Sequence, residues 1–451
     1  MSNTKRTFKF ELNVPNLKPA LTKFLDRIDI SHIILISAIL RFFVMSFPND
    51  GGTIFDEIHY IKATRAMLQG IAANAEHPPL TKIIGLISIK IFGDFWFAWR
   101  LPIVLFALAG TYVMYLLAKE ILKDEKLALV AAALSCVDII WFIHGNIFML
   151  EMPALTFSLA FAYYFYKKRY NISAVFIGLG FLCNEKALFI LLGMTIYQGL
   201  SYFKPKKVNA VLIKRTAIFL GVCVLVGAGG LFISDSIWKP SSATLVQIME
   251  NIIVVQNETL PITTTTTTAT QTDYEYISNP FSHVWFMITY YSGINSGIPQ
   301  ITETWRPPWS WILPIGENWN NPPTYMTTVI SRGDEMDFII NYRAQSTFPI
   351  WWMTIPLLII SILYYADDES KFIIGWVAGT YLPWVLWEPF KMNMPFNHYF
   401  FFTIPALCIG IPWFWKKVYP KHAYEMMFIH LLITIVFFSY YFPIGLVRTI
   451  F

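Results

Sequence analysis

The stretch of residues 54–110 reads IFDEIHYIKATRAMLQGIAANAEHPPLTKIIGLISIKIFGDFWFAWRLPIVLFALAG and combines two kinds of sequence. Its first part is crowded with ionisable side chains, among them Asp56, Glu57, Glu76 and His77. Its second part contains an apolar run, from about residue 97, that is long enough to cross the hydrocarbon core of a bilayer. The pattern predicts a charged loop that leads into a membrane-spanning helix.

The composition of the whole chain supports this interpretation. Of the 451 residues, 55% are hydrophobic and only 14% are charged, whereas soluble domains carry about a quarter charged residues. The net charge of +5 does not indicate a nucleic-acid partner, because basic residues in such a chain mainly set its orientation in the membrane. The four cysteines lie in apolar runs without metal-ligand spacing, so we expect neither a disulfide framework nor a metal site.

Apolar runs recur along the chain and predict an all-α polytopic protein of the cell membrane with about eleven transmembrane helices. The expected spans are residues 29–48, 97–118, 127–143, 147–166, 171–184, 186–203, 213–233, 349–366, 372–388, 398–415 and 423–443.

Basic residues orient these spans. If the N terminus is cytoplasmic, the inner connections hold 21 of the 34 Lys and Arg residues, whereas the long connection 234–348 holds only four. Positive residues favour the cytoplasmic side. We therefore expect the first outer loop, 49–96, and the long connection to lie on the outer side of the membrane.

This topology divides the chain into three parts. They are a seven-span half (1–233), a long outer loop (234–348) and a four-span half (349–451). Near the end of the outer loop, ETWRPPWSWILP (303–314) is expected to lie at the membrane interface, where Trp rings prefer to sit.

Ionisable residues then gather at the outer ends of several spans. Besides the acids and His77 of the first outer loop, they are Arg100, Asp138, His144, Glu151, Glu185, Lys186, Glu388, Lys391 and His398. Each alone has a structural explanation, such as a solvated acid or a cation that reaches the interface. Together they favour a functional cavity, because charges at membrane depth are costly and usually pair around one.

Transfer of a sugar from a polyprenyl phosphate to a hydroxyl needs this set of groups. A carboxylate must orient and deprotonate the acceptor, and Asp56 or Glu57 suits that task. Cations must bind the phosphate as it leaves, and Arg100 and Lys186 suit this second task. A lipid-linked donor also agrees with the lack of a nucleotide-binding motif in the sequence.

Several motifs are similar to those of the protein O-mannosyltransferases, which belong to the GT-C glycosyltransferases. The N-terminal half carries FDEIHY, EHPPLTKIIGLISIKIFG, FAWRLPIVLFALAG and GLGFLCNEKALFI in the family order. Later landmarks are NPFSHVW, STFPIWW and YLPWVLW followed by NHYFFFTIPAL. The resemblance therefore covers most of the chain.

The resemblance implies an inverting transferase without an obligatory cofactor. The donor would be dolichyl phosphate mannose, and the acceptors would be Ser or Thr residues of exported proteins. Asp56 would be the essential carboxylate and Glu57 its support. Arg100 and Lys186 would contact the lipid phosphate, while His77 and Lys82 shape the pocket. Glu76, Glu151 and Asp138 would be supporting acids, with His398 and Lys391 as further candidates on the outer face.

Some positions depart from the family pattern and leave alternatives open. Glu151 stands where relatives usually have an Arg followed by an Asp, and Asn397 replaces a Tyr. The outer loop is too short for the β-trefoil of eukaryotic members, which favours a prokaryotic, archaeal relative. The alternatives are a GT-C transferase that modifies a lipid or a lipid-linked glycan and, more remotely, a transporter without chemistry. Transporters tend to have repeated halves and a site at the midplane, unlike the pattern here.

Overall fold

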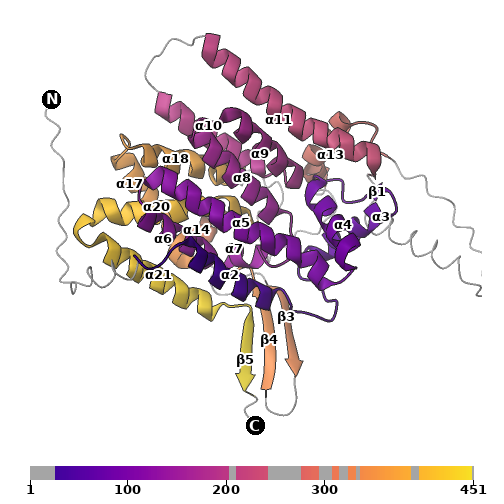
Figure 1. Ribbon diagram of the computed structural model, residues 1–451, viewed down its shortest axis with the longest axis horizontal. Coiled ribbons are helices and arrows are strands. Elements are labelled where there is room, and N and C mark those ends of the chain that lie inside the picture. The colour runs from indigo at the N-terminus through magenta and orange to yellow at the C-terminus, as the bar shows by residue number, and fades with distance from the viewer. Residues whose placement is uncertain are drawn as a thin grey trace, which may run out of the picture.

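The structure is a computed structural model that describes residues 26–202, 210–241, 276–293, 307–313, 324–331, 336–387 and 396–448. Its helices pack side by side into a bundle, and a small β-sheet extends from one edge of that bundle (Figure 1). The expected helical membrane fold is confirmed. Lys391, a candidate site residue, lies outside the described residues.

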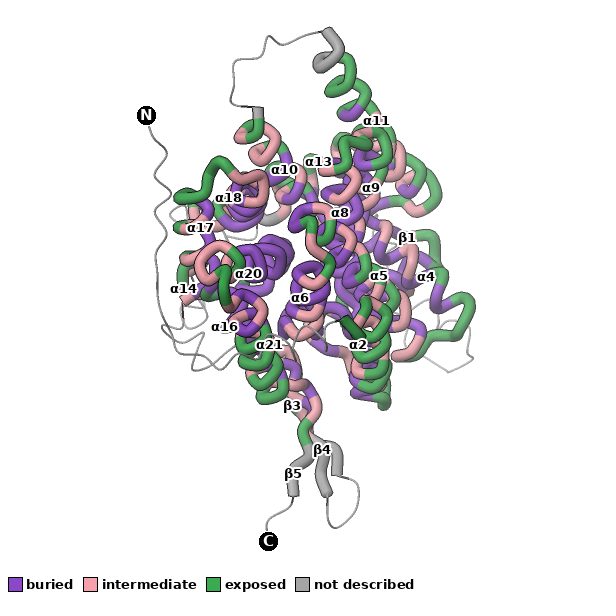
Figure 2. The backbone as a smooth tube through the Cα atoms, turned by 60° about the vertical axis from the view of Figure 1, so that its left-hand side comes forward, coloured by how far each residue is buried: buried purple, intermediate pink, exposed green. Residues whose placement is uncertain are grey.

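Each expected span coincides with one helix or with two consecutive shorter helices. The helices are α2 (Ile30–Val44), α5 (Trp96–Leu122), α6 (Glu125–Cys136), α7 (Ile139–His144), α8 (Glu151–Tyr166), α9 (Tyr170–Cys183), α10 (Ala187–Tyr202), α11 (Ala210–Ile237), α16 (Phe348–Trp351), α17 (Thr354–Leu363), α18 (Asp368–Thr380), α19 (Leu382–Trp387), the 3₁₀ helix η3 (Asn397–Phe402), α20 (Ile404–Val418) and α21 (Ala423–Tyr440). Buried residues concentrate inside the bundle, whereas α11 and α21 expose one face along most of their length (Figure 2).

Some expected spans are interrupted because polar or proline residues end a helix within an apolar run. The helix α6 ends at Cys136, and the carboxylate of Asp138 starts α7 by accepting the backbone N–H of Trp141 at 2.9 Å. Pro383 follows the break between α18 and α19, and Pro405 lies in the first turn of α20. Proline lacks an N–H donor and disfavours the preceding helical turn. Run length alone does not reveal these breaks.

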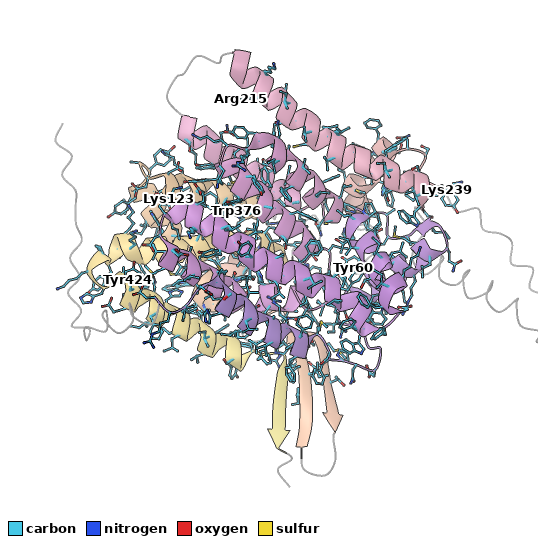
Figure 3. The ribbon with its side chains drawn as sticks, in the orientation of Figure 1. Tyr60, Lys123, Arg215, Lys239, Trp376 and Tyr424 are labelled. Atoms are coloured by element: carbon cyan, nitrogen blue, oxygen red, sulfur yellow. The ribbon has the colours of Figure 1, made fainter. Side chains whose placement is uncertain are left out.

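By length and composition alone, three of the described helices are long and apolar enough to cross a membrane. They are Trp96–Leu122, Lys214–Ile237 and Pro420–Tyr440. Eleven crossings, the orientation and the three-part division therefore stay predictions. Lys123, Arg215 and Tyr424, which the sequence predicts near the inner side, lie toward one end of the bundle, and Tyr60 and Lys239 lie toward the other (Figure 3).

The first outer loop is largely structured. It contains α3 (Glu57–Leu68), the short strand β1 (Ile71–Ala72) and α4 (Leu80–Phe92). Strand β1 pairs in parallel with β2 (Lys239–Pro240), which follows α11 directly. The loop is thus joined to the start of the long connection, where α13 (Pro280–Gly293) also packs.

A three-stranded antiparallel sheet was not expected from the sequence. Strands β3 (Thr324–Ser331) and β4 (Met336–Arg343) come from the long connection, and β5 (Ile444–Arg448) follows the last helix. The Tyr342 hydroxyl donates to the carbonyl oxygens of Val44 and Phe47 at 3.0 and 2.9 Å, which fixes β4 to the end of α2.

The Trp-rich segment also differs from expectation. It contains the short helix α14 (Trp309–Ile312), in which Trp309 is 44% exposed but Trp311 only 1%. The Trp311 ring packs against Tyr381 and Phe400 inside the bundle. The interface expectation is therefore wrong for Trp311, whose neighbours come from distant parts of the chain.

Candidate active site

Asp56 lies at the N-terminal end of α3, directly after a strained residue. Phe55 has a φ of +52°, a left-handed conformation that bulky residues rarely adopt. Such strain persists only where surrounding contacts hold it, often at functional sites. The Asp56 carboxylate does not cap α3. Among the described residues it makes no side-chain hydrogen bond or ion pair, so it remains available to a substrate.

The surroundings of Asp56 adjust its basicity. Burial raises the pKa of the Asp56 carboxyl, and the negative charge of Glu151 raises that pKa further. Electrostatic interactions with His59, His77 and Lys186 lower the pKa of Asp56 and so oppose these effects. A carboxylate with a raised pKa is a stronger general base than a solvated one.

Glu57 has a different environment from its neighbour. Both residues of the Glu57–Arg100 ion pair are 0% exposed. The carboxylate accepts from Nε and Nη2 of Arg100, at 2.9 Å each, and from the backbone N–H groups of Phe148 at 2.7 Å and Ile54 at 2.8 Å. Glu57 therefore fixes the position of the Asp56 turn on the bundle and has little capacity left for a substrate.

Arg100 likewise has a structural environment. Besides Glu57, its guanidinium donates to the carbonyl oxygens of Met45, Phe47, Pro48 and Gly52 at 3.0–3.1 Å. All five of its N–H donors thus have acceptors within the protein. A lipid phosphate would have to displace these contacts, so this geometry does not favour the expected role of Arg100 as a phosphate ligand.

Lys186 retains donors for a ligand. It lies in the turn between α9 and α10, with Nζ 3.5 Å from Oε1 of Glu151 and 4.4 Å from the ring centroid of Tyr399. Tyr399 in turn stacks on Trp384 at 4.7 Å. The ammonium makes no other ion pair among the described residues. It is therefore a cation held over an aromatic surface and directed by one carboxylate.

Two histidines complete the cluster around Glu151, which is the first residue of α8. His144 lies with Nδ1 3.8 Å from Oε2 of Glu151, and its Nε2 lies 3.1 Å from the hydroxyl of Tyr325. The His398 ring lies 5.4 Å from that of His144 and is 4% exposed, and its Nδ1 has no hydrogen-bond partner among the described residues. Oε2 of Glu151 also lacks such a partner. Buried polar atoms usually have partners, so these two unpartnered atoms are suited to bind a polar ligand.

The side chain of Lys82 holds the second half of the outer loop by binding backbone carbonyl groups of that loop. Its ammonium donates to the carbonyl oxygens of Asn74 at 2.6 Å, His77 at 2.9 Å and Ala73 at 3.4 Å. Burial lowers the pKa of Lys82 to about 8. These contacts use the three donors of the ammonium, so Lys82 shapes the loop rather than reaching a ligand.

His77 and Glu76 have separate contacts in this loop. His77 Nδ1 lies 3.4 Å from Glu185, which joins the loop to the turn between α9 and α10. Glu76 accepts a hydrogen bond from the side chain of Asn74 at 2.6 Å. Both therefore support the loop at the edge of the cluster.

Asp138 is not part of the cluster. Besides capping α7, its carboxylate accepts from the indole N–H of Trp351 at 2.8 Å. Both contacts are internal to the bundle, so the expectation of a supporting acid in the site does not fit this geometry.

Two residues of the long connection were missed by sequence reasoning. Tyr325 contacts both His144 and Phe55, although it lies about 180 or more residues from them in the chain. His283 on α13 pairs with Asp235 at 3.0 Å and lies with Nε2 2.8 Å from the carbonyl oxygen of Ala75. His283 stands in the NPFSHVW landmark, but nothing near it in the sequence indicates either partner.

Comparisons with known proteins address the family and the fold of the chain. Residues 76–228 match the family described as dolichyl-phosphate-mannose-protein mannosyltransferase, which confirms the resemblance drawn from the motifs. The structure of the S. cerevisiae protein O-mannosyltransferase Pmt1–Pmt2 complex bound to the sugar donor is similar, with a TM-score of 0.63 and 13% identity over 94% of this chain and 91% of that chain. The chain has the GT-C glycosyltransferase fold.

A second GT-C structure is similar over a smaller share of its own length. The Archaeoglobus fulgidus oligosaccharyltransferase in the apo form gives a TM-score of 0.52 at 10% identity, covering 91% of this chain and 55% of that one. None of the curated protein sequences matches the chain. The family match and the fold support a membrane glycosyltransferase that uses a lipid-linked donor.

Proposed function

We propose that this GT-C protein transfers a sugar, with mannose as the first candidate, from a polyprenyl phosphate to Ser or Thr hydroxyls of exported proteins. The reaction forms a bond between the acceptor oxygen and C1 of the sugar, with inversion. The bond from C1 to the phosphate oxygen breaks, the phosphate leaves with the electron pair, and the hydroxyl proton passes to a base.

The observation that carries this proposal is the contrast between Asp56 and Glu57. Two adjacent carboxylates lie beside the cluster, but only that of Glu57 is occupied in a buried ion pair. Asp56 has a raised pKa, and its carboxylate has no hydrogen-bonded or ion-paired side chain among the described residues, as a base that must receive a proton requires. We assign Asp56 as the base, with Glu57 and Arg100 as its support.

The donor phosphate is assigned to Lys186. Among the described residues its ammonium forms an ion pair with one carboxylate and keeps unused donors, whereas the donors of Arg100 and Lys82 are occupied. A cation in a water-poor site stabilises the charge that grows on the leaving phosphate. The aromatic pair Tyr399 and Trp384 beside it offers an apolar surface for the sugar or the first isoprene unit.

The acceptor class can be tested with the purified full chain. Polyprenyl phosphate mannose is supplied together with a Thr-containing peptide and with lipid extracts, and all products are analysed by mass spectrometry. The proposal expects a mass increase of one hexose on the peptide. Modified lipid with unmodified peptide would favour a lipid or glycan acceptor, and no transfer to either would contradict the glycosyltransferase assignment for this donor.

A further inference from the structure

Tyr325 stands at an irregular point of the sheet, next to the cluster. In the ladder of β3 and β4, Thr324 pairs with Arg343 and Met326 pairs with Tyr342, so Tyr325 has no partner strand residue. This is a β-bulge, a device that turns one side chain away from the regular pattern and is frequent beside active sites. The bulge directs Tyr325 toward the first outer loop and away from its own sheet.

Tyr325 contacts residues on both sides of the cluster, and its ring also lies 6.4 Å from that of His398. Its ring stacks on that of Phe55, with centroids 4.1 Å apart and the planes 17° from parallel. Its hydroxyl lies 3.1 Å from Nε2 of His144, the histidine beside Glu151. One side chain thus connects the Asp56 turn with the Glu151 group.

The sheet that carries Tyr325 is itself held firmly. Strand β4 is tied to the end of α2 by the two hydrogen bonds of the Tyr342 hydroxyl and is paired with β5 on its other side. Tyr325 is therefore presented from a fixed platform that comes from the long connection. Rigid elements hold site geometry better than isolated loops do.

The stack between Tyr325 and Phe55 matters because the backbone of Phe55 is strained. A left-handed Phe relaxes unless its side chain is retained, and any change in its dihedral angles turns the next residue, Asp56. We infer that Tyr325 is a positioning residue that holds Phe55 in its strained conformation and thereby aims the Asp56 carboxylate at the acceptor hydroxyl. This inference rests on the proposed role of Asp56 as base.

Two substitutions of Tyr325 distinguish the ring stack with Phe55 from the hydrogen bond to His144. Tyr325→Leu removes the stack and the hydroxyl, whereas Tyr325→Phe keeps the stack and loses only the hydrogen bond to His144. Misplacement of a catalytic group by about 1 Å can cost about a hundredfold in rate, so we expect Tyr325→Leu to lower kcat about 10- to 100-fold with little change in donor affinity. Loss of one hydrogen bond predicts a decrease of about two- to tenfold for Tyr325→Phe.

Hydrogen exchange supplies a readout that does not depend on activity. We expect faster amide exchange in the segment 54–57 of Tyr325→Leu, and near-parental exchange in Tyr325→Phe. Tyr440→Leu is the matched control, because Tyr440 is 81% exposed on α21 and its one ring contact among the described residues is with Tyr441. This control should match the parent in both kcat and exchange.

Parental kcat and parental exchange in Tyr325→Leu would overturn the inference while leaving the proposed function intact. An equal loss in Tyr325→Leu and Tyr325→Phe would also overturn it, because the stack would then contribute nothing. If Tyr325→Leu fails to give a melting transition in detergent, Phe55→Leu removes the same stack from the other side, together with the ring contacts of Phe55 with Phe396 and His398. Parental turnover of a folded Phe55→Leu then refutes the inference, and a 10- to 100-fold lower kcat supports it. No transfer by the parent would refute the proposed function instead.

Discussion

Replacing Glu57 with Gln should destabilise the protein far more than an ordinary surface exchange. The Glu57 carboxylate receives four N–H donors, two from Arg100 and one each from the backbones of Phe148 and Ile54. Gln replaces one acceptor oxygen with an NH₂ group that faces a donor, and it leaves the 0% exposed guanidinium without a counter-charge. Removing one partner of a buried pair costs about 3–5 kcal/mol, and we expect a loss of free energy of unfolding in that range.

The same loop contains a matched control for this effect. Arg65 and Asp94 form an ion pair at 2.7 Å whose side chains are 39% and 37% exposed. Exposed pairs contribute about 0–1 kcal/mol, so Asp94→Asn should change stability little. Unfolding in SDS or urea, followed by tryptophan fluorescence, measures both variants. Adding Arg100→Met to Glu57→Gln should recover part of the loss, because the unpaired charge is removed as well. Equal stability of Glu57→Gln and Asp94→Asn would refute the structural role of the buried pair.

Further predictions address topology, the donor and pH. In a cysteine-free background, Ser278→Cys should react with an impermeant thiol reagent from outside and Lys168→Cys only from inside, and labelling of both from one side would contradict the orientation. Lys186→Ala should weaken binding of a polyprenyl phosphate about 10- to 100-fold, as expected for lost hydrogen bonds to a charged group. Unchanged binding in a lipid-competition assay would exclude that role. Because Glu151 raises the pKa of Asp56, Glu151→Gln should move the acid limb of the pH profile of kcat/KM to lower pH, and a limb that stays in place or rises would contradict this coupling.

The sequence predicts the helical bundle well because each apolar run is a local signal. The positions of the main helices and the gathering of Asp56, Glu151 and Lys186 both followed from the runs and the orientation rule. The sheet could not be predicted in the same way, because β5 lies about a hundred residues beyond β4 and their pairing is non-local.

Individual roles in the site were harder to predict than its location. The sequence offers Asp56 and Glu57 as equivalent neighbours, and only the buried contacts of Glu57 with Arg100 distinguish them. Arg100 and Lys186 are likewise both cations at outer ends of spans, but only Lys186 keeps donors for a ligand. Tyr325 carries no local signal at all, since its significance comes from a bulge and from partners in the first third of the chain.

Whether Asp56 is the base that activates the acceptor can be measured with Asp56→Asn. The purified parent and Asp56→Asn are compared for sugar transfer from a short-chain polyprenyl phosphate mannose to a Thr-containing peptide, with donor binding and melting temperature recorded alongside. A positioned base contributes about a hundred- to ten-thousandfold, so kcat should fall by about that factor while donor binding and melting temperature stay near parental. Near-parental turnover by Asp56→Asn would contradict the account.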